Sequence, residues 1–162
     1  MKLVHNIDFK KLAISCAISL GVGALSAVVS MPGMSNFDKA AKPPLTPPSW
    51  LFPIVWTILF LLMGISAYIV YTNKSIESET HKQALIIYGA QLVVNFFWPI
   101  FFFNLSAYFF AFLWIILLLV LVIIMTRKFY SISPVAGALQ IPYIIWISFA
   151  TYLTFGVFVM NM

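Results

Sequence analysis

Two short stretches of the chain carry aromatic and amide side chains at the spacing that places residues on one face of a helix. The first set consists of Gln91, Asn95, Trp98 and Phe102. The second set consists of Tyr143, Trp146, Ala150 and Leu153. Indole and phenyl rings stack on flat apolar molecules, and an amide adds a hydrogen bond. The two faces together predict a pocket for a flat, largely apolar ligand.

A proline-rich stretch at residues 42–60 leads into a third apolar helix that carries Trp56. Prolines lack a backbone N–H and fix φ, so the run from Pro43 to Pro48 favours a stiff, extended path. Ser49 is a suitable N-cap, and Pro53 is tolerated only in the first turn of the helix that follows. We therefore expect the loop of residues 32–48 to act as a lid over the pocket.

The amides have a second interpretation, because an amide in hydrocarbon must find a partner and this face should therefore point inward. A hydrogen bond to another helix contributes on average about 0.6 kcal/mol in membrane proteins. For Gln91 the sequence favours such a structural bond. For Asn95 the structural bond and ligand contact are equally consistent with the sequence. Trp50, near a helix end, is expected to be an interfacial anchor.

The composition is that of a membrane protein, with 63% hydrophobic and 8% charged residues against about 25% charged in soluble domains. The charge-free run 83–126 is too long for one crossing, so we expect a break at residues 104–106. No alternation supports a β-barrel. The chain is predicted to be an all-α membrane protein, a single five-transmembrane-helix bundle covering residues 1–162. The expected helices are about 12–31, 49–72, 83–103, 106–126 and 133–159.

The charged residues lie outside these spans and indicate an orientation. Seven basic residues fall on the side of the N-terminus, and only Lys39 and Lys42 fall on the other. The positive-inside rule predicts a cytoplasmic N-terminus and a C-terminus outside, with an uncleaved first helix. The net charge of +5 is spread over short loops, so nucleic acid is not an expected partner.

The sequence lacks the groups that most membrane chemistry needs. No Asp, Glu, Lys, Arg or His lies within a predicted span, which argues against an ion-coupled transporter. His5 and His81 have no partners at metal-ligand spacing, and Cys16 is the single cysteine; no metal and no required cofactor are expected. Neither a nucleophile with a matching base nor paired carboxylates are present.

Three motifs resemble those of one known family. The sequences KPPLTPPSWLFPIVWTILFLLMG at 42–64, QLVVNFFWPIFF at 91–102 and PYIIWISFATYL at 142–153 resemble the TspO/MBR family of tryptophan-rich sensory proteins and translocator proteins (peripheral benzodiazepine receptors). The resemblance extends over residues 12–158. It implies a five-helix membrane receptor, often a homodimer, with a pocket beneath the loop between its first two helices. Family ligands are tetrapyrroles such as protoporphyrin IX, isoquinoline-type molecules and, in some members, cholesterol.

By motif position, the resemblance places the family's pocket tryptophans on Trp56 and Trp146, its asparagine on Asn95 and its small residue on Ala150. We therefore expect the ligand-binding residues to be Phe37, Pro47, Trp56, Phe60, Asn95, Trp98, Tyr143, Trp146, Ala150 and Leu153.

The chain departs from the family pattern at three places. Leu45 stands where many members have tryptophan, and Phe37 stands where relatives often have tyrosine. Phe155 and Val159 occupy the positions of a tyrosine and a basic residue in the family's cholesterol motif, so sterol binding of that type is not expected.

The first expectation is a tetrapyrrole receptor in a bacterial cytoplasmic membrane. Two alternatives remain open: a light- and oxygen-dependent enzyme that degrades porphyrin, and a transporter of a hydrophobic solute. The sequence shows no inverted repeat or paired broken helices in support of transport. A homodimer is expected from the resemblance. The small face of the first helix, with Ser15, Ser19, Gly23 and Ala27, favours packing within the chain over a dimer contact.

Overall fold

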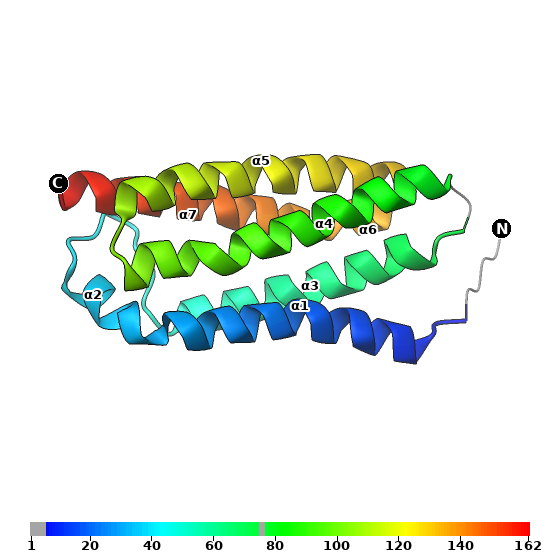
Figure 1. The fold of residues 1–162 in the computed structure, drawn as a ribbon, viewed down its shortest axis with the longest axis horizontal. Helices are drawn as coiled ribbons and strands as arrows, with labels where there is room; N and C mark the ends of the chain where they lie inside the picture. The colour runs from blue at the N-terminus through cyan, green and yellow to red at the C-terminus, as the bar shows by residue number, and fades with distance from the viewer. Residues whose placement is uncertain (1–5, 75–76) are drawn as a thin grey trace.

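The computed structural model describes residues 6–74 and 77–162, and within these ranges every regular element is a helix. Five helical stretches of the described chain are long and apolar enough to cross a membrane, and they lie side by side along one axis (Figure 1). The predicted all-α bundle is therefore confirmed. The long helices are α1 (Phe9–Ser30), α3 (Leu51–Thr72), α4 (Ser78–Pro99), α5 (Tyr108–Ile132) and α7 (Ile141–Met160).

The connection between the first two spans, expected as a loop at 32–48, is partly helical. After α1 the chain forms a 3-10 turn, η1 (Met31–Gly33), and a short helix, α2 (Met34–Lys39). Residues 40–50 then run without helix to α3, because this stretch contains the prolines that cannot continue one. The N-cap of α3 is Trp50, not Ser49, and it makes no side-chain capping bond.

Pro99 changes the geometry of the third span. It is the last residue of α4, and the chain continues as a wider π-type turn, η2 (Ile100–Asn104), in which Leu105 N–H donates to Ile100 O at 3.1 Å. A proline lacks the N–H and crowds the preceding turn, which explains the altered register. The predicted break at residues 104–106 is confirmed, and Ser106 there has a φ of 48°.

The last span is interrupted where the sequence predicted one helix over 133–159. A short helix, α6 (Pro134–Ala138), ends before Leu139, and α7 begins at Ile141 with Pro142 in its first turn. Because Pro142 lacks an N–H, it fits the start of a helix better than its interior.

Helices α1 and α3 approach each other closely at small residues. Ser15 Oγ donates to Gly64 O at 2.7 Å, and Ser19 Oγ donates to Phe60 O at 2.7 Å. A Cβ added at Gly64 would lie 2.6 Å from Cys16 Cα, so only glycine permits this contact. Part of the small face of α1 therefore packs within the chain, while the expected homodimer stays a prediction.

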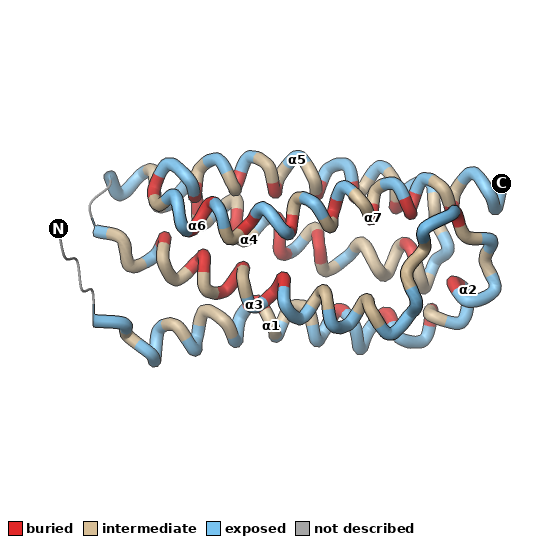
Figure 2. Tube along the Cα trace, turned by 180° about the vertical axis from the view of Figure 1, so that it is seen from behind, coloured by how far each residue is buried: buried red, intermediate tan, exposed pale blue. Residues whose placement is uncertain are grey.

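Buried residues lie on the inward sides of the helices, and exposed ones follow the outer sides (Figure 2). The centre is apolar, and its fully buried members include Met63, Ile115, Val122, Met125, Phe129 and Ile147. The outer surface carries many large apolar side chains, as expected of a protein whose solvent is lipid.

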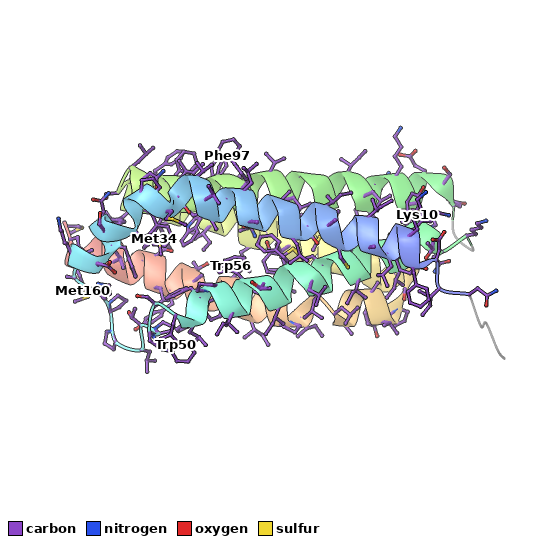
Figure 3. All side chains as sticks on the ribbon, turned by 90° about the horizontal axis from the view of Figure 1, so that it is seen from below. Lys10, Met34, Trp50, Trp56, Phe97 and Met160 are labelled. Carbon is purple, nitrogen blue, oxygen red and sulfur yellow. The ribbon has the colours of Figure 1, made fainter. Side chains whose placement is uncertain are left out.

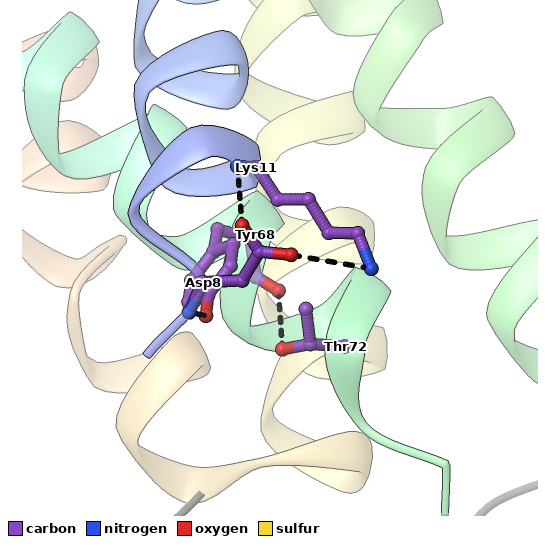
Figure 4. A network of polar contacts seen from close by, with 4 residues as sticks. All are labelled: Asp8, Lys11, Tyr68 and Thr72. Carbon is purple, nitrogen blue, oxygen red and sulfur yellow. Dashed lines mark hydrogen bonds and ion pairs between the residues drawn. The ribbon is translucent and has the colours of Figure 1, made fainter. Parts of the chain in front are cut away.

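The start of α1 is joined to the end of α3 by a small polar network (Figure 4). Asp8 caps α1 by accepting from Lys11 N–H at 3.1 Å and pairs with Lys11 Nζ at 3.5 Å. Its own N–H donates to Tyr68 Oη at 2.9 Å, and Thr72 Oγ1 donates to Tyr68 O at 2.8 Å. The hydrogen bond from the Lys11 backbone is the main cause that lowers the pKa of the Asp8 carboxyl.

Acidic and basic side chains lie at helix ends and in connections throughout the described chain. One end of the bundle carries Asp8, Lys10, Lys11, Lys74, Glu77, Glu79, Lys82, Arg127 and Lys128, and the other carries Asp38, Lys39 and Lys42. The stretches between these ends contain no Asp, Glu, Lys or Arg within the described residues. This distribution matches a bundle whose middle lies in hydrocarbon.

Candidate ligand-binding site

A cavity of about 270 Å³ lies among α1, α2, α3, α4 and α7. Trp56 of α3 lies between α1 and α3, whereas Trp50 lies at the outer edge of the bundle (Figure 3). Eight of the ten residues predicted to bind a ligand line the cavity. They are Phe37, Trp56, Phe60, Asn95, Trp98, Trp146, Ala150 and Leu153.

The other two predicted residues, Pro47 and Tyr143, do not line the cavity. Pro47 belongs to the extended loop at residues 40–50. Tyr143 is 1% exposed and lies behind Asn95. Its hydroxyl accepts from Asn95 Nδ2 at 2.6 Å and donates to Gln91 Oε1 at 2.8 Å. Tyr143 therefore orients the asparagine in the cavity wall.

The structure distinguishes the two interpretations of the amides, a structural hydrogen bond and contact with a ligand. Gln91 is fully buried, accepts from Tyr143 and places Nε2 3.8 Å from Met63 Sδ, so its role is structural, as predicted. Asn95 bonds to Tyr143 on α7 and also lines the cavity. The structural bond and access to a ligand are thus compatible for Asn95.

Aromatic rings form most of the remaining wall. Trp56 packs on Phe60 with ring centroids 5.6 Å apart, and Trp98 stacks on Phe102 at 5.0 Å and 18° between planes. Trp146 meets Phe52 edge-on at 5.8 Å. These rings present flat, polarizable surfaces on several sides of the cavity.

Two indole nitrogens of the wall lack a hydrogen-bond partner. Nε1 of Trp98 and Nε1 of Trp146 are buried and make no hydrogen bond to any other residue that the structure describes. Trp114, outside the cavity, differs because its Nε1 donates to Val94 O at 2.7 Å. Buried N–H groups normally have partners, so these two indoles are exceptions among the residues that line the cavity.

The cover of the cavity is α2 rather than the proline-rich loop. Met34 and Phe37 of α2 line the cavity, and Phe37 packs against Phe102 and Phe103 at centroid distances of 5.5 Å. Residues 40–50 do not line it. The lid predicted at 32–48 therefore divides into a helical cover and an outer strap, which we define as residues 40–50.

The strap is fastened to α7. Ala41 N–H donates to Asn161 Oδ1 at 3.0 Å, and Asn161 Nδ2 donates back to Ala41 O at 2.8 Å. Tyr152 Oη donates to Pro44 O at 2.9 Å. Pro43 lies so close to Gly156 that a Cβ there would be 2.6 Å from the proline ring.

The site also contains residues that the sequence analysis did not predict. The α1 wall consists of small residues, Gly23, Ser26, Ala27 and Ser30. Two of these, Gly23 and Ala27, belong to the small face noticed in the sequence, but small side chains give no sign of a ligand. In residues 6–74 and 77–162 no three His, Cys, Asp or Glu side chains come together as metal ligands do.

Comparison with known proteins assigns the family. The model of the TspO/MBR family matches residues 14–160. The chain is 32% identical to tryptophan-rich protein TspO of Chlorobaculum tepidum over 96% of this chain and 99% of that protein. It is 34% identical to protein CrtK of Rhodobacter capsulatus, covering 91% and 89%, and 31% identical to the translocator protein of Homo sapiens, covering 87% and 83%. The chain belongs to the TspO/MBR family of integral membrane proteins.

Proposed function

We propose that the protein is a membrane receptor that binds a tetrapyrrole of the protoporphyrin IX type, or a similarly flat isoquinoline-type molecule, in this cavity. The observation that carries the proposal is the wall of aromatic rings, Trp56, Trp98 and Trp146 among them, with the amide of Asn95 beside them. A protoporphyrin combines a flat apolar ring with carboxylate oxygens. The rings of the wall suit its face, and the amide of Asn95, which lines the cavity, suits a polar group on its edge.

The volume of the cavity limits which ligands can bind without movement of the protein. Its 270 Å³ is slightly below the range of about 300–1,000 Å³ for small-molecule pockets. A tetrapyrrole therefore needs α2 and the strap to move outward, whereas a smaller flat ligand fits with less rearrangement. Displacement of α2 breaks the packing of Phe37 on Phe102 and Phe103 and the hydrogen bond from Asn36 Nδ2 to Phe103 O at 3.0 Å, so a larger ligand binds at a cost that a smaller one avoids.

The direct test is titration of the purified protein with protoporphyrin IX, following the shift of the porphyrin absorption band. Changing Trp56 and Trp146 together to Leu should weaken binding about tenfold or more, since stacking on a ring is worth about 1–3 kcal/mol per contact. Trp50→Leu is the control, because Trp50 is 66% exposed and outside the cavity. Equal affinity for the double variant and the wild type would refute the proposal.

Light-dependent degradation of porphyrin and passage of a hydrophobic solute remain predictions from the resemblance. Illuminating the same complex and following loss of the absorption band distinguishes binding from degradation. We also propose that the basic end of the bundle faces the bacterial cytoplasm, as the positive-inside rule predicts. Thiol labelling of a single cysteine placed at Ser78 in intact cells, with Cys16→Ala as background, tests that orientation.

A further inference from the structure

A second hollow is lined by residues from the end of α3 and the start of α4. It has a volume of about 710 Å³ and is separate from the aromatic cavity, with which it shares no residue. Its lining includes Lys74, His81 and Lys82 on the polar side and Tyr71, Leu85 and Ile86 on the apolar side. The hollow therefore has a cationic part and an apolar part next to each other.

Among the residues that the structure describes, the cationic part has no acidic partner. Lys74 and Lys82 are exposed, and neither forms an ion pair with any residue in the described parts of the chain. The neighbouring carboxylates, Glu77 and Glu79, do not line the hollow. Glu79 Oε1 instead accepts from Gln83 Nε2 at 3.2 Å, one turn along α4.

His81 also lines the hollow. Its Nε2 is buried and makes no hydrogen bond within residues 6–74 and 77–162. Ser78, the first residue of α4, also lines the hollow, and α4 has no side-chain cap at its N-terminus. The first N–H groups of a helix favour an anion, so they support what the lysines and His81 indicate independently.

The apolar part continues from the helix ends toward the hydrocarbon. Ile86 is 59% exposed and Tyr71 is 62% exposed, and both lie on the membrane-facing surface of spans that begin or end here. Tyrosine at such a level is typical of the interface between headgroups and acyl chains. A molecule that fills the hollow thus has an anionic group at the helix ends and an apolar chain along α4.

We propose that this hollow binds an anionic phospholipid, with its phosphate between Lys74, His81 and Lys82 and an acyl chain against Leu85 and Ile86. Clustered basic residues next to a membrane span attract acidic lipids at roughly tenfold or less per residue. Basic residues that only set the orientation of the spans need no such arrangement. They require positive charge on one side of the membrane but neither a hollow nor an apolar wall.

The experiment compares lipid retention in native mass spectrometry of the detergent-solubilised protein, with equal amounts of dioleoyl phosphatidylglycerol and dioleoyl phosphatidylcholine. We expect the wild type to retain the phosphatidylglycerol about thirtyfold better, which corresponds to attraction by two lysines. The test variant changes Lys74 and Lys82 to Gln. The control variant changes Arg127 and Lys128 to Gln, which removes the same charge from the same end but outside the hollow.

Loss of the preference in the first variant and its retention in the second support the proposal. An equal fall in both variants means that overall charge alone attracts the lipid, and it overturns the proposal, as does an unchanged preference in the Lys74 and Lys82 variant. Inorganic phosphate is added as a competitor in a third arm. Displacement of phosphatidylglycerol by millimolar phosphate identifies a soluble anion as the ligand and overturns the assignment to lipid.

Discussion

Asn95 reaches the cavity from α4 while its amide nitrogen is held 2.6 Å from the hydroxyl oxygen of Tyr143 on α7. The same hydroxyl donates to Gln91 Oε1. One buried tyrosine thus satisfies two amides on the facing helix and sets the direction in which Asn95 can meet a ligand.

Replacing Tyr143 with Phe removes this hydroxyl and leaves both amides short of a partner. The expected loss is about 1–3 kcal/mol of stability, seen as a fall of about 2–10 °C in the melting temperature in detergent. Protoporphyrin affinity should also decrease several-fold, because Asn95 is no longer oriented. Tyr130→Phe is the control, since Tyr130 is 59% exposed. A melting temperature equal to that of the control would show that the network contributes nothing.

Ala150 is the small residue that leaves space beside Trp146 in the cavity wall. Changing Ala150 to Leu should fill part of the cavity and reduce protoporphyrin affinity about tenfold or more, while the melting temperature stays the same or rises. Titration and thermal melting on the same preparation check both parts. A variant that still binds with wild-type affinity would place the ligand elsewhere.

Gly156 allows the strap to lie against α7. Gly156→Ala places a Cβ 2.6 Å from the ring of Pro43, and the strap must shift to accommodate it. Such overpacking costs about 1–3 kcal/mol, so trypsin cleavage after Lys39 should become about tenfold faster. Lys42 is followed by proline and resists trypsin, so Lys39 is the trypsin site between α1 and α3.

The matched control for this experiment is Gly89→Ala, because a Cβ at Gly89 meets no atom within 4 Å. Both changes put the same methyl group into a long helix. If the two variants are cleaved at the same rate, contact between Pro43 and Gly156 does not hold the strap.

Asp8 gives the protein a dependence on acid pH. The hydrogen bond from Lys11 N–H lowers the pKa of its carboxyl below the ordinary 3.8, so the ionised form stabilises the fold at pH values above that figure. This stabilisation is lost as the pH falls through the lower pKa of the folded protein. Asp8→Asn keeps a capping oxygen but cannot ionise.

The difference in melting temperature between wild type and Asp8→Asn should therefore be constant near neutral pH and shrink below about pH 4. Asp8→Ala, which removes the cap itself, should be less stable than Asp8→Asn at neutral pH. If the difference in melting temperature between wild type and Asp8→Asn is the same at neutral and acid pH, the ionised carboxylate of Asp8 does not stabilise the protein.

Periodicity was sufficient to find the walls that consist of large side chains. Trp98 and Phe102 share one face of their helix, and Trp146 and Ala150 share one face of theirs. Each of these faces turns toward the inside of the bundle. Tyr143 shares that spacing with Trp146, yet it lies behind the wall, because spacing defines direction around a helix but not which neighbour covers the side chain. The structural role of Tyr143 depends on Asn95 and Gln91, which are about fifty residues away in sequence.

The residues that cover the cavity were harder to predict from the sequence than its aromatic walls. A run of prolines indicates an extended path but not the surface on which it packs, and Pro47 is outside the cavity because the strap follows α7. The walls from α1 contain Gly23 and Ser26, whose small side chains indicate close packing and carry no chemical signal. The interruption before Ile141 differs, because Pro142 is a local signal for the first turn of a helix.

The position of the charges at the two ends of the bundle has a consequence for how the protein responds to an energised membrane. One elementary charge moved across 100 mV changes the free energy by about 2.3 kcal/mol. Since the described helices carry no Asp, Glu, Lys or Arg between their ends, rearrangement of their midsections transfers no side-chain charge through the electric field. Occupancy of the aromatic cavity by an uncharged molecule should then follow its concentration in the bilayer and be indifferent to transmembrane voltage.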